Sequence, residues 1–202
     1  MLAEKREKFK KIENKTGEIF SKLLTPNQYS LISIFFAFLC FLFLVKNNLV
    51  FALVFFFIAS FLDFIDGAVA RITQRATKKG AYLDTICDRY VEGVIYLGLL
   101  FLPLPRVLFP AYVWIFLAFF GSLLTTYSKA AAKEKEIIEK ELKKGFVGRG
   151  ERMILTFLAL FLGIFNLSWM LYLIIILAIL TNITALQRIS LVLKSSISKR
   201  SG

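Results

Sequence analysis

The sequence contains no histidine and only two cysteines, Cys40 and Cys87. The absence of histidine excludes a Ser-His-Asp triad, a histidine general base and a zinc site with histidine ligands. Two cysteines are too few for a zinc cluster, and both lie in apolar stretches, where a free cysteine packs as a small hydrophobic side chain. Acid–base or metal chemistry in this chain therefore depends on carboxylates, lysines and tyrosines.

Polar residues are also too few for a soluble domain of 202 residues. Hydrophobic residues make up 57% of the chain, 22 residues are phenylalanine, and the mean hydropathy is +0.68. This composition disagrees with a soluble enzyme, a disordered chain and a disulfide-stabilised secreted domain. It predicts a protein of the lipid bilayer. The net charge of +12 then indicates membrane topology and anionic head groups, and no nucleic-acid partner is expected.

Six apolar blocks predict an all-α bundle of six transmembrane helices. A spanning helix needs ~20 apolar residues. The second, third, fourth and sixth blocks are long enough, whereas the first and fifth are short. The blocks are Tyr29–Val45, Leu49–Ala70, Ala81–Leu102, Val107–Tyr127, Met153–Phe165 and Trp169–Leu193. We expect residues 1–202 to form a single membrane domain, with the six-helix bundle in residues 25–202.

Lysine and arginine are concentrated on one side of this predicted bundle. They lie before the first block, between the second and third, between the fourth and fifth, and after the sixth. The other connections hold only Lys46 and Arg106. Cytoplasmic loops carry the positive excess. The pattern predicts a multi-pass protein of the cell membrane with both termini, and the helix ends described next, on the cytoplasmic side.

Residues 1–24 are expected to form a juxtamembrane helix. Apolar residues recur there at near-helical spacing among lysines and glutamates: Leu2, Phe9, Ile12, Ile19, Phe20 and Leu23. This pattern predicts an amphipathic helix lying on the cytoplasmic leaflet, and the alternative is a solvated basic arm. The following Thr25-Pro26-Asn27 predicts a break and a restart into the first span.

Four aspartates lie at the cytoplasmic ends of the second and third predicted spans. Asp63 and Asp66 are three residues apart, and Asp84 and Asp88 are four apart, so each pair shares a helix face. Ionisable groups at membrane depth are costly and usually functional. On adjacent antiparallel helices the pairs would converge, and all-oxygen ligands suit Mg²⁺ or Mn²⁺, of which four aspartates can hold two. The alternative is structural pairing with nearby arginines.

The aspartates belong to a longer pattern. It reads Asp63-x2-Asp66-Gly67-x2-Ala70-Arg71-x8-Gly80-x3-Asp84-x3-Asp88. In full it resembles the signature of the CDP-alcohol phosphotransferases, and the resemblance covers essentially the whole chain. It implies an enzyme of phospholipid biosynthesis that transfers a phosphatidyl-type group from a CDP-linked lipid to an alcohol, releases CMP and forms a homodimer. Small residues that would permit close helix approach in a dimer are Gly93, Gly98, Ala118 and Gly121.

The resemblance also implies roles for single residues. Asp63, Asp66 and Asp84 would bind a first metal ion, and Asp63, Asp84 and Asp88 a second. Asp88 would be the general base. The residues that would border the CDP-lipid are Asn27, Gly67, Arg71 and Thr77. Those that would keep the two helices close are Ala70 and Gly80.

The acceptor alcohol is predicted from cations in the second half of the chain. Lys129 follows the fourth block, Arg149 and Arg152 open the fifth, and Arg188 lies late in the sixth. If these helix ends converge beside the aspartates, they form a cationic pocket that suits a phosphate-bearing alcohol. The segments also resemble the inositol-phosphate branch of the family, which makes archaetidylinositol phosphate or phosphatidylinositol phosphate from CDP-archaeol or CDP-diacylglycerol.

Two other readings remain. A sister enzyme of the same family would use glycerol 3-phosphate or serine as acceptor. A transporter or channel with an acidic metal site would explain aspartates inside the membrane. It would not explain why Gly67, Ala70 and Gly80 stand at the family spacing.

Overall fold

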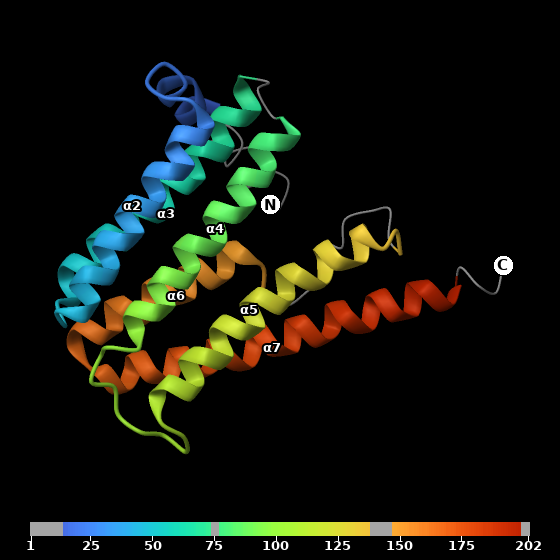
Figure 1. Cartoon of the computed structure of the whole chain (residues 1–202). Coiled ribbons are helices and arrows are strands. Elements are labelled where there is room, and N and C mark those ends of the chain that lie inside the picture. The colour runs from blue at the N-terminus through green and yellow to red at the C-terminus, as the bar shows by residue number, and fades with distance from the viewer. Residues whose placement is uncertain (1–13, 74–76, 138–146, 199–202) are drawn as a thin grey trace, which may run out of the picture. The chain divides into compact units, whose positions relative to one another are not determined.

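The computed structural model describes residues 14–73, 77–137 and 147–198, with side chains described up to residue 194. Its helices are α2 (Pro26–Val45), α3 (Leu49–Ile72), α4 (Lys78–Leu99), α5 (Ala111–Glu134), α6 (Arg149–Phe165) and α7 (Leu167–Ser198) (Figure 1). A short helical stretch precedes them at residues 14–20. The described residues form no sheet beyond an isolated bridge between Val107 and Phe109, so the all-α prediction is confirmed.

Four of the described helices are long and apolar enough to cross a membrane, which makes the chain a multi-pass membrane protein. These are α2, α3, α5 and the part of α7 from Leu167 to Lys194. The first block was expected to be short, but α2 reaches 20 residues because it begins at Pro26. The third block was expected to qualify, but α4 does not, because its apolar part contains Asp84, Asp88, Arg89 and Glu92. Helix α6 has 17 residues.

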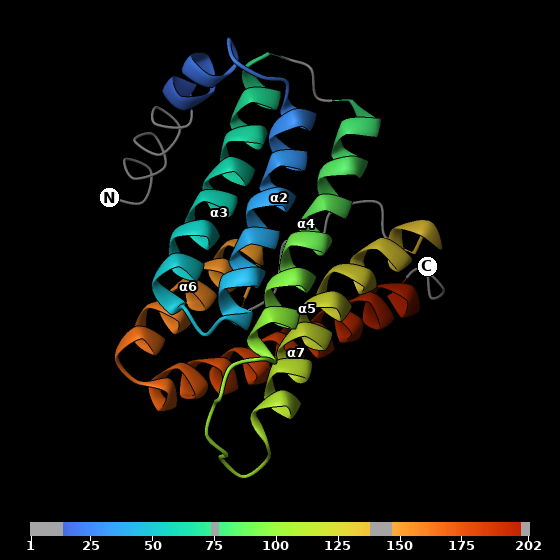
Figure 2. The same cartoon turned by 60° about the vertical axis from the view of Figure 1, so that its left-hand side comes forward.

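The chain divides into two compact units, Met1–Gly98 and Leu99–Gly202. In the first unit, α2 and α3 run side by side, as both views show (Figure 1, Figure 2). Small buried residues, Ala37 on α2 and Ala52 and Ala59 on α3, allow this close packing. Residues 46–48 join the two helices, and the Asn48 side chain caps α3 by accepting a hydrogen bond from the Phe51 backbone N–H at 3.2 Å.

The segment before α2 packs against the end of α3. The Tyr29 hydroxyl donates to the Phe20 carbonyl at 2.9 Å, and the Phe20 ring meets the Tyr29 ring edge-on. Gly17 is buried, and a Cβ atom added there would lie 2.8 Å from the Ala68 carbonyl oxygen. The segment therefore crosses α3 at a distance that only glycine permits. The predicted juxtamembrane helix was expected to reach residue 24, but the helical stretch ends at residue 20 and a turn follows; residues 1–13 lie outside the described residues.

In the second unit, α7 packs against both α5 and α6. Gly121 on α5 lies at the crossing with α7, where an added Cβ atom would come within 2.6 Å of the Thr181 hydroxyl oxygen. The Asn182 side chain donates to the Leu117 carbonyl of α5 at 2.8 Å. Gly98, in the first unit, would similarly bring a Cβ atom within 2.6 Å of Leu44. Three of the four small residues considered for a dimer interface, Gly98, Gly121 and the fully buried Ala118, thus serve packing within the chain.

Candidate functional site

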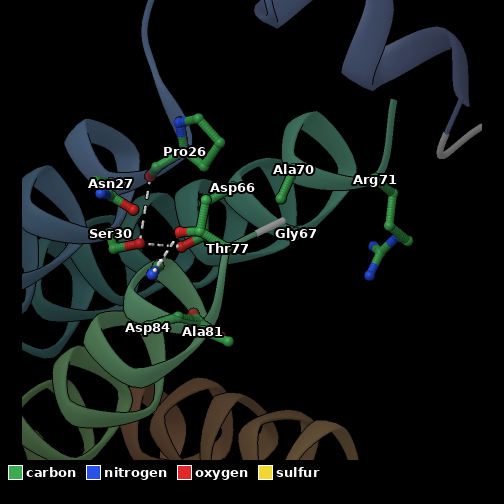
Figure 3. Close-up of a pocket in the computed structure, with 11 residues that line it drawn as sticks. Pro26, Asn27, Ser30, Asp66, Gly67, Ala70, Arg71, Thr77, Ala81 and Asp84 are labelled. Carbon is green, nitrogen blue, oxygen red and sulfur yellow. Dashed lines mark hydrogen bonds between the residues drawn. The ribbon is translucent and has the colours of Figure 1, made fainter. Parts of the chain in front are cut away.

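A cavity of about 200 Å³ opens in the first unit where the start of α2, the end of α3 and the start of α4 meet. Its lining residues are Pro26, Asn27, Ser30, Asp66, Gly67, Ala70, Arg71, Thr77, Gly80, Ala81 and Asp84 (Figure 3). All the residues predicted to border the CDP-lipid or to hold the helices together are among them. The fold therefore gathers around one space a set of side chains that the sequence distributes over three segments.

Three of the four predicted metal ligands lie together. Asp63, Asp66 and Asp84 each offer a carboxylate oxygen, and these oxygens all lie within 4.8 Å of one another. Asp66 is buried, and the other two are half-buried. A set of three carboxylates from two helices fits a hard divalent cation such as Mg²⁺ or Mn²⁺. Asp88 is buried one turn further along α4 and is not one of the three, so its membership of a second metal site stays a prediction.

Two glycines shape the cavity. A Cβ atom at Gly80 would lie 3.1 Å from the Thr77 hydroxyl oxygen and 3.3 Å from the Asn27 side-chain oxygen. The start of α4 can therefore approach α2 closely, whereas the predicted role of Gly80 in bringing α4 close to α3 stays a prediction. A Cβ atom at Gly67 would lie 3.2 Å from a guanidinium nitrogen of Arg71, four residues further along α3. The bare backbone at Gly67 leaves room beside that guanidinium.

Two features of this site were not predicted from the sequence. The Thr77 hydroxyl accepts a hydrogen bond from the Gly80 backbone N–H at 2.9 Å, so Thr77 stabilises the start of α4 in addition to lining the cavity. The Ser30 hydroxyl donates to a carboxylate oxygen of Asp66 at 2.7 Å. Ser30 follows Asn27 by three residues on α2, so helical periodicity alone would have placed both on one face.

The predicted acceptor residues lie in the second unit. Arg152 is 2% exposed on α6, and Arg188 on α7 donates through Nη1 to the Thr125 carbonyl of α5 at 2.7 Å. These two guanidinium groups are close enough for their like charges to interact. Lys129 on α5 and Arg149 on α6 are half-buried. The structure therefore brings Arg152 and Arg188 together, and a position beside the aspartates stays a prediction for all four cations.

Comparison with known proteins gives a consistent match. Residues 23–186 match the family model described as CDP-alcohol phosphatidyltransferase. The chain is 30% identical over 192 residues to an archaetidylinositol phosphate synthase of Pyrococcus horikoshii. This match covers 94% of this chain and 95% of that protein. It is also 36% identical over 142 residues to a bifunctional IPC transferase and DIPP synthase of Aquifex aeolicus. This match covers 68% of this chain but only 32% of that protein.

Solved structures share the fold. The crystal structure of a Mycobacterium tuberculosis phosphatidylinositol phosphate synthase in complex with manganese and citrate matches with a TM-score of 0.77 at 23% identity, over 90% of this chain and 88% of that one. The form of that synthase with CDP-DAG bound matches with a TM-score of 0.74 at 24% identity, over 90% and 94% of the two chains. At this identity the likeness concerns the fold.

Proposed function

Since the chain belongs to the CDP-alcohol phosphatidyltransferase family, we propose that it transfers the phosphatidyl-type group of a CDP-linked lipid to inositol phosphate and releases CMP. The observation that carries the choice of acceptor is the match to the archaetidylinositol phosphate synthase of Pyrococcus horikoshii over nearly the full length of both chains. The donor is CDP-archaeol or CDP-diacylglycerol, which carry the same reacting phosphates.

The clustered carboxylates are the metal-binding part of this proposed site. Asp63, Asp66 and Asp84 hold a first divalent ion, and Asp63, Asp84 and Asp88 a second. The close grouping of the first three supports this assignment. Mg²⁺ or Mn²⁺ bound there would offset the negative charge of the pyrophosphate and of the departing CMP.

The cavity residues bind the nucleotide end of the donor. Arg71 lines the cavity with a guanidinium group that suits phosphate and planar bases, and Gly67 leaves space beside it. Asn27 and Thr77 also line the cavity with polar side chains. Ala70 and Gly80 keep the helices close enough for these contacts to be made together.

Asp88 is the general base. The acceptor hydroxyl oxygen forms a bond to the β-phosphorus of the donor, and the bond from that phosphorus to CMP breaks. Asp88 takes the hydroxyl proton. Its burial, with a relative exposure of 9%, keeps bulk water from competing for that role.

The acceptor phosphate is bound by the cations of the second unit. Arg152 is almost fully buried and its charge acts on Arg188, and two guanidinium groups this close to one another suit a phosphate dianion. Arg152 and Arg188 therefore bind the phosphate of inositol phosphate, with Lys129 and Arg149 contributing from the same helix ends. Neutral inositol would not need such a group.

The membrane arrangement completes the proposal. All six helices span the bilayer as one domain of residues 1–202. Helices α4 and α6, which do not qualify as spans by themselves, cross the bilayer packed against other helices of the bundle. Residues 1–24 form a juxtamembrane segment whose amphipathic helix lies on the cytoplasmic leaflet, and the site and both termini face the cytoplasm. The asymmetric distribution of lysine and arginine supports this orientation. Two copies assemble as a homodimer.

The proposal is tested with a panel of acceptors. The purified chain in detergent micelles receives radiolabelled CDP-archaeol or CDP-diacylglycerol and Mg²⁺ or Mn²⁺. Inositol phosphate, inositol, glycerol 3-phosphate and serine are then offered separately. We expect labelled lipid product and equimolar CMP with inositol phosphate alone. Product formation with glycerol 3-phosphate or serine instead would overturn the choice of acceptor, and no CMP release with any alcohol would overturn the reaction.

A further inference from the structure

The most deeply buried carboxylate of the cluster is in contact with a hydroxyl group from another helix. Asp66 on α3 is 5% exposed, and one of its carboxylate oxygens accepts a hydrogen bond from the Ser30 hydroxyl of α2 at 2.7 Å (Figure 3). Ser30 itself is 3% exposed. A hydrogen bond from a neutral donor to a buried carboxylate is short and strong, and water does not compete for it.

The donor is held in place by the start of α2. The Thr25 backbone N–H donates to the Gln28 side-chain oxygen at 2.8 Å, and Pro26 occupies the first helical position. Tyr29, next to Ser30, is tied to the Phe20 carbonyl. The Ser30 hydroxyl therefore reaches Asp66 from a well-fixed helical turn.

The Ser30 proton has a competing acceptor. The Pro26 carbonyl oxygen, one turn earlier on α2, lies 3.3 Å from the Ser30 hydroxyl oxygen. The distance to the Asp66 carboxylate oxygen is 2.7 Å, against 3.3 Å to the Pro26 carbonyl oxygen, and the carboxylate is charged. The Ser30 hydroxyl therefore donates mainly to Asp66.

We propose that Ser30 is a positioning residue for the metal-binding carboxylate of Asp66, an inference that rests on the metal site of the proposed function. The hydrogen bond occupies one carboxylate oxygen and fixes the plane of the group. The oriented carboxylate then offers an oxygen to a cation held together with Asp63 and Asp84. A lysine or arginine in place of Ser30 would also orient Asp66, but its charge would offset the negative charge that a cation needs. A hydroxyl orients the ligand and leaves that charge intact.

The test measures metal binding directly, without donor or acceptor. Mn²⁺ is titrated into the full-length chain in detergent micelles, and free Mn²⁺ is followed by electron paramagnetic resonance. Ser30→Ala should bind Mn²⁺ roughly 10–100-fold more weakly, the usual effect of removing an outer hydrogen-bond partner of a metal ligand. Ser30→Thr, which keeps the hydroxyl, should retain most of the affinity.

Ser33→Ala is the matched control. Ser33 is also a buried serine of α2, one turn further on, but its hydroxyl donates to the Ser30 backbone carbonyl at 2.7 Å. Its loss should leave Mn²⁺ affinity unchanged. Circular dichroism checks that each variant keeps its helical content, and Ser30→Cys, which keeps the volume and weakens the donor, replaces Ser30→Ala if the latter does not fold.

The outcomes separate the inference from the function on which it rests. Unchanged Mn²⁺ affinity in Ser30→Ala, with a wild-type chain that binds Mn²⁺, overturns the positioning role alone. Equal weakening by Ser30→Ala and Ser30→Thr assigns the loss to packing and also overturns it. A wild-type chain that takes up no Mn²⁺ overturns the metal site itself and the inference with it.

Discussion

The three clustered carboxylates differ in what their replacement should cost. Asp63 and Asp84 are half-buried carboxylates on different helices, and both are assigned to two metal ions. Asp66 is more deeply buried and is already bonded to Ser30. Loss of charge at Asp63 or Asp84 should therefore affect metal binding more than folding.

The first prediction concerns these two ligands. Asp63→Asn or Asp84→Asn should abolish CMP release while the helical content and the thermal unfolding midpoint in detergent stay near those of the wild type. Asparagine keeps the shape of the side chain and removes the charge that holds the cation. An excess of chelator should have the same effect on the wild-type chain, and re-addition of Mg²⁺ or Mn²⁺ should restore turnover. Full turnover in chelator would contradict the two-metal assignment.

The second prediction concerns the acceptor cations. Arg188→Ala should raise the KM for inositol phosphate roughly ten- to hundredfold, because losing a charge-assisted contact costs ~1.5–3 kcal/mol. The KM for the CDP-lipid should change far less, since Arg188 is assigned to the acceptor alone. Arg188→Lys should be intermediate, because an ammonium group keeps the charge but loses the paired geometry.

Lys133→Ala serves as the control for Arg188→Ala. Lys133 is an exposed cation in the last turn of α5, and its removal should leave both KM values unchanged. An Arg188→Ala variant with an unaltered KM for inositol phosphate would remove the main physical support for this acceptor.

At the scale of elements, the segment before α2 supports α3 close to the aspartates. Gly17 contacts α3 at Ala68, two residues after Asp66, and Phe20 packs with Tyr29 beside a buried cluster that includes Ile65 and Val69. The residues of α3 that contact this segment thus alternate with those that line the cavity. A displacement of the segment should therefore shift the residues of α3 that line the cavity.

The third prediction uses Gly17 to test this support. In a helix, Gly→Ala usually stabilises by ~1 kcal/mol. At Gly17 the new Cβ atom would meet a backbone carbonyl at 2.8 Å, and overpacking of this kind typically costs ~1–3 kcal/mol. We therefore expect Gly17→Ala to lower the thermal unfolding midpoint.

Gly150→Ala is the matched comparison for Gly17→Ala. Gly150 lies in the first turn of α6, and a Cβ atom there would have no neighbour within 4 Å. This variant should be neutral or slightly more stable. If Gly17→Ala behaves like Gly150→Ala, the segment does not pack on α3 as closely as described.

Helix existence and the aspartate faces could be predicted from the sequence because both depend on local periodicity. Helix ends could not. Helix α5 continues past the predicted end at Tyr127 to Glu134, and α6 begins at Arg149, ahead of the predicted Met153. Hydropathy detects only the apolar part of a helix, whereas backbone hydrogen bonding continues into the polar flank. The Ser30–Asp66 bond also escaped prediction, because it joins residues 36 positions apart through the packing of two helices.

At the scale of the whole molecule, large apolar side chains remain exposed along every described helix that qualifies as a span. Examples are Phe35 on α2, Phe57 on α3, Phe116 on α5 and Ile176 on α7. Lipid tails cover such surfaces, and a second copy of the chain can cover part of them. The exposed apolar surface is thus compatible with the proposed homodimer.

The fourth prediction concerns that assembly. Native mass spectrometry of the chain released from micelles should give the mass of a dimer, twice 23.1 kDa. Each copy holds its own aspartate cluster, so the two sites should bind metal independently. We therefore expect the Mn²⁺ titration to show two equivalent aspartate clusters per dimer, one in each copy. Only monomer across a range of protein concentrations would contradict the dimer.

Helix α4 has a consequence for how the protein is made. Asp88 and Arg89 stand at its middle, and Arg89 pairs with the buried Glu92 at 2.7 Å. Asp and Arg each oppose insertion by ~2.5–3.5 kcal/mol at the centre of a helix. An isolated α4 should therefore fail to leave the translocon for lipid, and we expect it to insert only together with α2 and α3, which precede it in the chain.

The fifth prediction concerns the dependence of α4 insertion on α2 and α3. Insertion is measured during synthesis by the glycosylation of reporter sites placed on either side of α4. Alone, α4 should insert poorly, and together with α2 and α3 it should insert well. Replacing Asp88, Arg89 and Glu92 by leucine should let α4 insert by itself, in a chain that has lost its proposed base. Efficient insertion of unaltered α4 alone would contradict this view. The proposed base and the buried ion pair beside it would thus make the membrane insertion of the first unit cooperative.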